Sequence, residues 1–271
     1  MRTNVKMQLK TSLLHFGDER MGTMQIARTM KFKVGEEFID IPVYTGNAFR
    51  GTLRRIAMKD FLDHIGITEE GISAKLYYLL FTGGALTSGS RYEEIGKRRE
   101  MRRLCPPLSL FGSAIGDQIP AGKLKMPIFI PICKETVDYT EIESNLSFYD
   151  MLEDNFYTRR DDLKSKDFNL TDEEKFKNPV QMKYDQQCLV AGTELTGNVV
   201  IENDNEIERD CLKAILDRFT EMPYIGGKSA AGHGEVKITY EFNGNADSYY
   251  KYLEENKEEI RSWLRNLEGV L

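Results

Sequence analysis

Two glycine-containing segments carry the side chains of this chain that are best suited to hold an anion. The first is GNAFRGTLRR at 46–55, where we expect a helix with Asn47 as its N-cap. Free N–H groups at a helix start favour an anion, and arginines add charge-assisted hydrogen bonds. The arginines of this segment are Arg50, Arg54 and Arg55. A solvated helix face is the alternative interpretation.

The second segment is the loop MPYIGGKSAAGHG at 222–234. A mononucleotide-binding loop needs a glycine where Met222 stands, so that interpretation fails. What remains is a loop whose backbone N–H groups, together with Lys228 and Ser229, could approach a phosphodiester closely. A plain hairpin connection is the alternative. His233 is expected to be a loop residue or at most an RNA contact, and not a catalytic base.

Residues for catalysis or metal binding are not grouped in this sequence. Asp161 and Asp162 are adjacent, but adjacent side chains usually point in different directions, and a charged surface insertion explains them better. The histidines and the four cysteines are scattered, without the spacing of a metal site or a disulfide framework. We therefore expect no catalytic residue, no metal and no cofactor, and reduced thiols in a cytoplasmic protein.

The 271 residues have a formal net charge of −6, which by itself disfavours a simple basic nucleic-acid-binding domain. The charge is unevenly distributed along the chain. The net charge is +5 over residues 1–60 and +4 over 91–125, but −8 over 135–176 and −3 over 241–271. Because screening limits each patch to roughly 10 Å, a basic groove can bind phosphates on an acidic molecule. An even mixing of charges in the folded chain is the alternative.

The spacing of apolar residues predicts a mixed α+β domain. We expect strands at 3–14, 39–43, 123–132, twice within 181–201 and at EVKITYEF, and helices at 47–66, 69–82, 91–103, 206–220 and near the C-terminus. CPPLSLFGSAIG is expected to be rich in turns. This order fits a ferredoxin-like sheet with insertions. No apolar run approaches the ~20 residues of a membrane span, so we expect no membrane contact.

Four segments, in order, resemble one family, the RAMP superfamily, and within it the Cas-seven-like backbone subunits of Class 1 CRISPR effector complexes. IPVYTGNAFRGTLRR (41–55) resembles the family's IPGSSLKGxLR helix start, and LFGSAIGDQIPAGKLKM (110–126) its LFG…GRL segment. VAGTELTGNVVIE (190–202) resembles its PAGTxF strand pair, and MPYIGGKSAAGHGEVKI (222–238) its LGGxxxRGxGRV loop. The helix start, the nearby ARTMK and the RRDD insertion are most similar to the type IV branch.

The resemblance implies an RRM-like (ferredoxin-like) palm, built as a single domain over residues 1–271. Inserted into it would be a loop at 15–37, a helical finger at 67–105 and a thumb at 150–182. A C-terminal helix would follow at 245–268.

The resemblance also implies a set of RNA contacts, because family members polymerise along CRISPR guide RNA with its phosphates on the palm. The helix start, the Gly-rich loop, the base of the thumb and a basic stripe in the first long loop would face the RNA. The implied contacts are Asn47, Arg50, Arg54, Arg55, Lys228, Ser229, His233, Arg159, Arg160, Met182, Arg28, Lys31 and Lys33.

One departure from the family pattern bears on catalysis. In type III relatives an Asp in the first long insertion cleaves target RNA, whereas MQIARTMKFK (24–33) contains no Asp or Glu. Asp18 and Asp40 flank this stretch without matching the position. The sequence therefore predicts a non-catalytic backbone subunit. The alternatives are a type III-like RNase that uses a loop Asp, and a cytoplasmic ligand-binding α+β protein unrelated to nucleic acid.

The implied partners follow from this role. They are CRISPR guide RNA, target DNA or RNA by base pairing, further copies of the chain in a head-to-tail filament, and other effector subunits, with a helicase as one candidate. A subunit that holds any guide must read phosphates and shape rather than base edges. In such a filament, acidic thumb and C-terminal surfaces are expected to meet basic neighbours.

Overall fold

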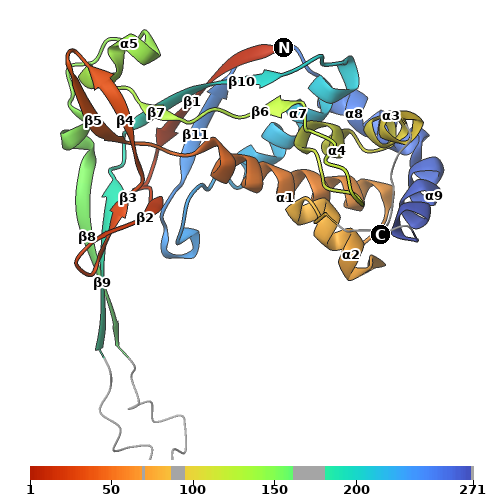
Figure 1. Cartoon of the computed structure of the whole chain (residues 1–271), viewed down its shortest axis with the longest axis horizontal. Helices are drawn as coiled ribbons and strands as arrows, with labels where there is room; N and C mark the ends of the chain where they lie inside the picture. The colour runs from red at the N-terminus through yellow and green to blue at the C-terminus, as the bar shows by residue number, and fades with distance from the viewer. Residues whose placement is uncertain (69–70, 87–94, 161–180, 270–271) are drawn as a thin grey trace, which may run out of the picture.

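A central antiparallel sheet carries the fold of the computed structural model (Figure 1), which describes residues 1–68, 71–86, 95–160 and 181–269. Its strands are β1 (Arg2–Leu9), β6 (Leu124–Lys125), β7 (Ile130–Pro131), β10 (Glu194–Ile201) and β11 (Val236–Tyr240). Their order is β11-β1-β10-β6, and β7 also pairs with β10. One long helix follows β1 and another follows β10, which is the β-α-β-β-α-β pattern of a ferredoxin-like palm. The expected fold class is confirmed.

The alternation of residues in β1 shows how the sheet meets the core. Val5, Met7 and Leu9 are buried, whereas Asn4 before them and Lys6 between them are exposed on the other face. Successive side chains of a strand point to opposite faces, so one face of the sheet enters the core and the other remains polar. The strand pairs with β10 on one side and β11 on the other.

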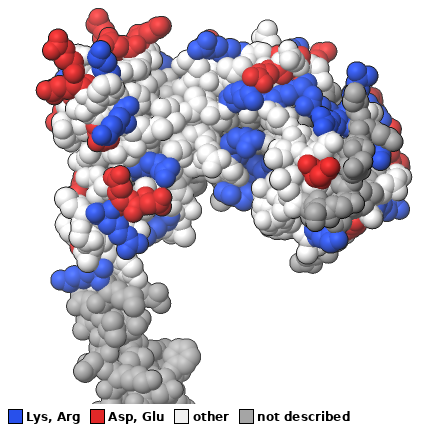
Figure 2. Space-filling model, viewed as in Figure 1, with Lys and Arg blue, Asp and Glu red and all other residues white. Residues whose placement is uncertain are grey.

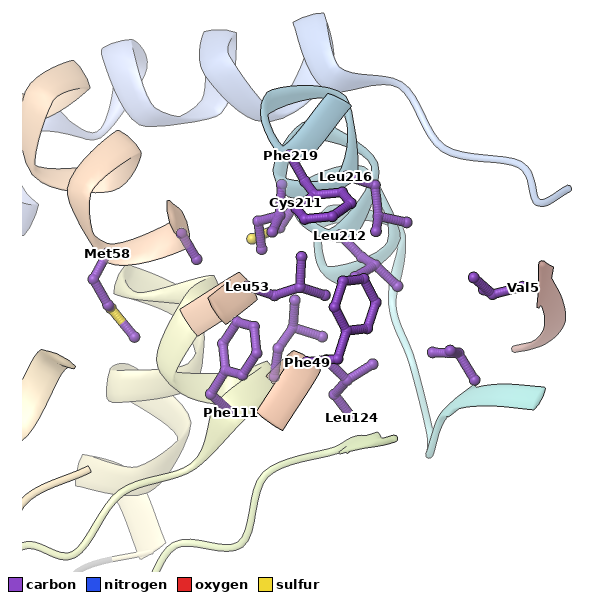
Figure 3. Packing of buried hydrophobic residues seen from close by; sticks show 14 of the residues in the cluster. Val5, Phe49, Leu53, Met58, Phe111, Leu124, Cys211, Leu212, Leu216 and Phe219 are labelled. Atoms are coloured by element: carbon purple, nitrogen blue, oxygen red, sulfur yellow. The ribbon is translucent and has the colours of Figure 1, made fainter. Parts of the chain in front are cut away.

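Two helices, α1 (Gly46–Ile65) and α7 (Glu206–Glu221), supply much of the packing in this core. The ring of Phe49 in α1 meets Phe219 of α7 edge-on, with 5.3 Å between centroids (Figure 3). Phe49 also packs edge-on against Phe129, at 5.5 Å. A capping box begins α7: the Asn205 side chain accepts from the Glu208 N–H, and Glu208 accepts in return from the Asn205 N–H. The helix predicted at 206–220 is confirmed.

The stretch 15–37 contains three strands, so the long loop expected there is wrong. The strands β2 (Phe16–Met21) and β3 (Met24–Ala27) join a second sheet of order β2-β3-β9-β8, with β8 (Leu152–Arg160) and β9 (Gln181–Leu189). The next two strands, β4 (Thr29–Val34) and β5 (Glu37–Pro42), form a separate two-stranded ribbon. Gly22 and Gly35 turn the chain with φ of 64° and 60°. The strands are short, and the partner of β3 is distant in sequence.

The segment between α1 and β6 contributes a helical insertion. It contains α2 (Ala74–Tyr77), the π-helix η2 (Tyr78–Thr82), α3 (Ile95–Leu104) and α4 (Pro106–Phe111). The helix α4 lies where turns were expected. Prolines are tolerated at its first two positions, because the N–H groups that they lack would have no partner within the helix. The strand expected at 123–132 is two short strands, β6 and β7, with an irregular stretch between them.

The C-terminal segment forms two helices rather than the one expected. They are α8 (Ala246–Glu255) and α9 (Lys257–Glu268), and the chain changes direction at Asn256, whose φ and ψ are −106° and 9°. The described residues also contain the short helices η3 (Lys134–Thr136), α5 (Val137–Thr140), η4 (Phe148–Met151) and η5 (Ser229–Ala231). Among the described residues, no helix has the length and apolar character needed to cross a bilayer.

Candidate nucleic-acid interface

The start of α1 is held by residues from outside the helix. Thr45, in extended conformation, is the N-cap, two residues before the predicted Asn47, which lies exposed in the first turn. The Thr45 N–H donates to Nε2 of His15 at 3.2 Å. Burial, reinforced by the charge of Arg28, lowers the pKa of His15 to about 4, so this acceptor nitrogen is neutral at pH 7. No acidic residue lies in the first turn, which suits an anion there.

The three arginines of α1 have different surroundings. Arg55 is exposed. Arg50 is half-buried, donates a hydrogen bond to the carbonyl oxygen of Phe111 and lies 5.8 Å over the Phe111 ring; burial lowers its pKa. The guanidinium group of Arg50 is therefore held in place at the edge of the helical insertion, and Arg55 is the freely reachable cation of this segment.

Arg54 is buried, with 6% of its surface exposed, and the predicted RNA contact does not fit this position. Its guanidinium donates to the carbonyl oxygens of Leu80, Gly112 and Leu79, at 2.6, 2.9 and 2.9 Å. Desolvation is the main cause that lowers its pKa, to about 10, which still leaves it charged at pH 7. Arg54 thus ties α1 to the helical insertion, and we remove it from the RNA-contact set.

The Gly-rich loop presents Lys228 to solvent in a left-handed backbone conformation, with φ of 56°. Its Nζ lies 4.6 Å from the ring centroid of Tyr157 and 5.2 Å from that of Tyr184, so two rings of the β8–β9 hairpin position the ammonium group. Ser229 follows, exposed, at the start of η5. Two glycines allow the close approach that this loop requires: a Cβ at Gly234 would lie 1.9 Å from the Ile225 carbonyl oxygen, and one at Gly226 would lie 2.5 Å from the Leu14 carbonyl oxygen.

His233 is 5% exposed, and its burial contradicts the predicted RNA contact. Its Nδ1 is hydrogen-bonded to Oγ of Ser12 at 2.8 Å, and its Nε2 to the hydroxyl of Tyr157. The imidazole therefore joins the Gly-rich loop to the residue stretch after β1 and to the hairpin strand β8. We assign it a positioning role.

Residues 12–15 bring the two candidate anion-binding segments together. Ser12 contacts His233, Gly227 donates its N–H to the Leu14 carbonyl at 2.8 Å, and His15 binds the start of α1. The Gly-rich loop and the α1 N-terminus are therefore neighbours. The two sequence motifs, taken separately, did not predict this proximity. Figure 2 shows Lys and Arg side chains on the concave side between the β8–β9 hairpin and α1.

Of the predicted contacts in the first long insertion, Lys31 and Lys33 lie on a strand, whereas Arg28 lies between β3 and β4. Lys31 and Lys33 are exposed on β4, opposite Asp40 and Phe38 of β5. Arg28 is half-buried, and its backbone N–H donates to the His15 carbonyl at 2.8 Å, which places it beside the α1 start.

The hairpin β8–β9 begins the segment predicted as a thumb. Arg159 pairs with Met182 and Arg160 with Gln181 in its backbone ladder, so these predicted contacts share the far end of the hairpin. Residues 161–180, with Asp161 and Asp162, lie outside the described residues, as does part of the predicted finger, 87–94.

Sequence reasoning missed the residues that arrange this surface. They are Ser12, His15, Tyr157 and Tyr184. Asn155 and Tyr157 alternate along β8 without forming a motif, and only the period-two pattern of the strand could have placed Tyr157 on one face.

Within the described part of the chain, no group of three or more His, Cys, Asp or Glu side chains is arranged to hold a metal ion. Burial raises the pKa of the Cys105 thiol to about 12, which leaves it a packing residue at neutral pH. Asp18 lies in β2, and Asp40 pairs with Lys31 in the ribbon.

Together, the palm, the hairpin beside it and the shared basic surface define an α+β, RRM-like protein. No protein-family model matches the chain, and no curated protein matches it. Among solved structures, its fold matches a chain described as "Type IV-B CRISPR Complex", with a TM-score of 0.65, over 89% of this chain and 90% of that chain, at 21% identity. The chain therefore shares the fold of a component of a type IV CRISPR complex, in agreement with the fold implied by the family resemblance.

Proposed function

We propose that this chain is a non-catalytic backbone subunit of a type IV-like CRISPR effector complex, which binds the sugar–phosphate backbone of guide RNA. The observation that carries the proposal is the meeting of the Gly-rich loop and the α1 N-terminus through residues 12–15. The loop contributes the ammonium group of Lys228 and α1 contributes the guanidinium group of Arg55, both exposed, and such cations suit phosphate binding without base recognition.

The proposed contact set is smaller than the sequence implied. It keeps Asn47, Arg55, Lys228 and Ser229, which are exposed, with Arg50 at the edge. Lys31, Lys33 and Arg28 extend the surface, and Arg159, Arg160 and Met182 place the hairpin tip near the RNA. Copies would lie head to tail along the guide, other effector subunits would complete the complex, and pairing with target DNA or RNA would use the bases left facing outward.

Charge reversal at two exposed contacts tests this proposal. Arg55→Glu with Lys228→Glu should remove the nuclease-sensitive RNA that co-purifies with the chain from gentle lysis, because both cations would then repel phosphate. The matched control is Lys251→Glu with Arg265→Glu, which changes the net charge equally on the exposed surface of α8 and α9. Unchanged RNA content in the first variant, or equal loss in both, would refute the mapped surface.

A separate measurement tests the alternative assignment, in which the chain is an RNase. The assembled complex is incubated with labelled complementary RNA and a divalent cation. Intact RNA agrees with a scaffold, whereas regularly spaced cuts would overturn the non-catalytic assignment.

A further inference from the structure

An apolar groove with an acidic rim lies at one end of the molecule. Its volume is about 420 Å³, and it is lined by residues from the region of α5 and η4 and from the turn before β10. Ile142, Leu146 and Met151 contribute apolar surface, whereas Glu143 and Glu194 carry negative charge. Leu146 is 57% exposed, so it extends the apolar surface of the groove to the outside.

A buried polar atom in this groove lacks a protein partner. The hydroxyl of Thr193, a lining residue that is itself 4% exposed, makes no hydrogen bond with any part of the chain that the structure describes. Buried hydroxyl groups are nearly always hydrogen-bonded, so this one is suited to meet a group from outside.

The opposite end of the molecule presents an apolar patch with a basic rim. Tyr78, at the start of the π-helix η2, is 51% exposed and borders a small hollow of about 130 Å³ together with Lys75. Ile119, 66% exposed, follows Gln118, whose side chain accepts a hydrogen bond from Arg98 of α3. Tyrosine and arginine are enriched in protein interfaces relative to the rest of the surface, which favours an interface here.

The two surfaces complement each other and cannot meet within one molecule. In Figure 1, where the longest axis is horizontal, α5 and β8 lie at the left end and α2 and α3 at the right end. The groove has Glu143 and Glu194 beside its apolar residues, whereas the other surface has Lys75 at its hollow and Arg98 bonded to the neighbour of Ile119. A contact between two different faces of identical chains is heterologous and repeats from copy to copy.

We propose that the groove between η4 and the β10 turn receives the α2–η2 face of a second copy of this chain, with Tyr78 and Ile119 on the apolar floor and Lys75 and Arg98 against Glu143 and Glu194. This contact rests on the proposed function, since it supplies the protein–protein step of assembly along guide RNA. The contact pairs this groove with this one face.

Paired charge reversals test the contact on a long RNA that several copies can share. Glu143→Lys with Glu194→Lys should abolish cooperative assembly, and Lys75→Glu with Arg98→Glu should do the same, each weakening the copy-to-copy contact by about tenfold or more. The chain that carries all four changes should regain cooperativity, because every pair is then reversed. Sedimentation measures the assembled length. The matched control, Glu202→Lys with Glu241→Lys, should assemble like the unchanged chain.

A short RNA that accommodates one copy separates this proposal from the proposed function. Each reversed variant should bind the short RNA as the unchanged chain does, since the substitutions lie away from the anion-binding segments. Cooperative assembly that survives both reversals would overturn the contact while leaving the RNA-binding assignment intact. Failure of the unchanged chain to bind either RNA would overturn the assignment of function.

Cysteine cross-linking tests the contact without relying on RNA. The four native cysteines are buried. Leu146→Cys and Tyr78→Cys variants, mixed at high concentration under mild oxidation, should form a disulfide-linked pair that neither variant forms alone. No mixed pair, with both variants folded, would overturn the proposal.

Discussion

His233 of the Gly-rich loop and Tyr157 of β8 share a hydrogen bond between the imidazole Nε2 and the phenol hydroxyl. The rings also meet edge-on, with 5.5 Å between centroids. Because Lys228 of the same loop lies over the Tyr157 ring, one tyrosine fixes both the buried and the exposed side of the loop. These contacts hold the hairpin and the proposed phosphate-binding loop in a fixed arrangement relative to each other.

Removing the hydroxyl of Tyr157 tests this arrangement. Tyr157→Phe keeps the ring beneath Lys228 but leaves a buried nitrogen of His233 without its partner. An unpaired buried polar group costs about 1–3 kcal/mol, so the free energy of unfolding measured in urea should fall by that amount. Tyr149→Phe, at a ring that is exposed on η4, should change it by less than about 0.5 kcal/mol. Equal effects of both substitutions would contradict the coupling.

Arg54 and Arg55 are neighbours in α1 with opposite expected behaviour. Arg54→Ala removes the donor to three carbonyl oxygens in the interior, and we expect a loss of about 3 kcal/mol or more in unfolding free energy. Arg55→Ala, at an exposed position, should cost less than about 0.5 kcal/mol but weaken RNA binding. Thermal denaturation and RNA titration of the two variants give the comparison. A stable Arg54→Ala protein would refute the structural role.

Local patterns in the sequence were sufficient to predict some helices and strands. The helix predicted at 47–66 ends at the expected place, where Gly66 is the C-cap of α1 with φ of 70°. The apolar stripe of α7 and the strands around the β9–β10 turn also follow from short-range periodicity.

Other features depend on partners far away in the chain. Whether an arginine of α1 faces solvent depends on where Leu79, Leu80 and Gly112 pack, and helical spacing carries no such information. The strands β2 and β3 are stabilised as strands by β9, more than 150 residues later. The basic surface was predicted as separate motifs, because residues 12–15, which join them, have no motif of their own.

The pH dependence of the free energy of unfolding should reflect the protonation of His15. Its pKa in the folded chain is about 4, below the usual 6.5, so the unfolded chain binds more protons between these values. Stability from this group is complete above about pH 6.5 and is lost as the pH falls towards 4. Allowing for partial exposure, we expect about 2 kcal/mol from this group. His15→Gln, whose amide oxygen can accept from Thr45 but does not titrate, should flatten the curve of unfolding free energy against pH in that window.

Two glycines of α1 should respond oppositely to alanine. A Cβ at Gly46 would lie 2.0 Å from the Pro127 carbonyl oxygen, so Gly46→Ala must push the α1 start away from the loop before β7. We expect a loss of about 3 kcal/mol, as for other overpacked sites. At Gly51 the nearest atom is a flexible guanidinium nitrogen of Arg55 at 3.8 Å. Gly51→Ala should therefore raise the free energy of unfolding by about 0.5–1 kcal/mol. Chemical denaturation of both variants measures the difference in sign.

The salt dependence of RNA binding distinguishes phosphate contacts from other roles. For a single strand, each neutralised phosphate contributes about 0.7 to the slope of log affinity against log salt concentration. Lys228→Ala and Arg55→Ala should each reduce that slope by about this amount, and uniformly across RNA sequences, because the proposed contacts read no bases. Lys237→Ala, on the exposed face of the edge strand β11, is the matched control and should leave the slope unchanged. A slope that stays constant in the first two variants would mean that Lys228 and Arg55 do not meet phosphate, whatever their effect on affinity.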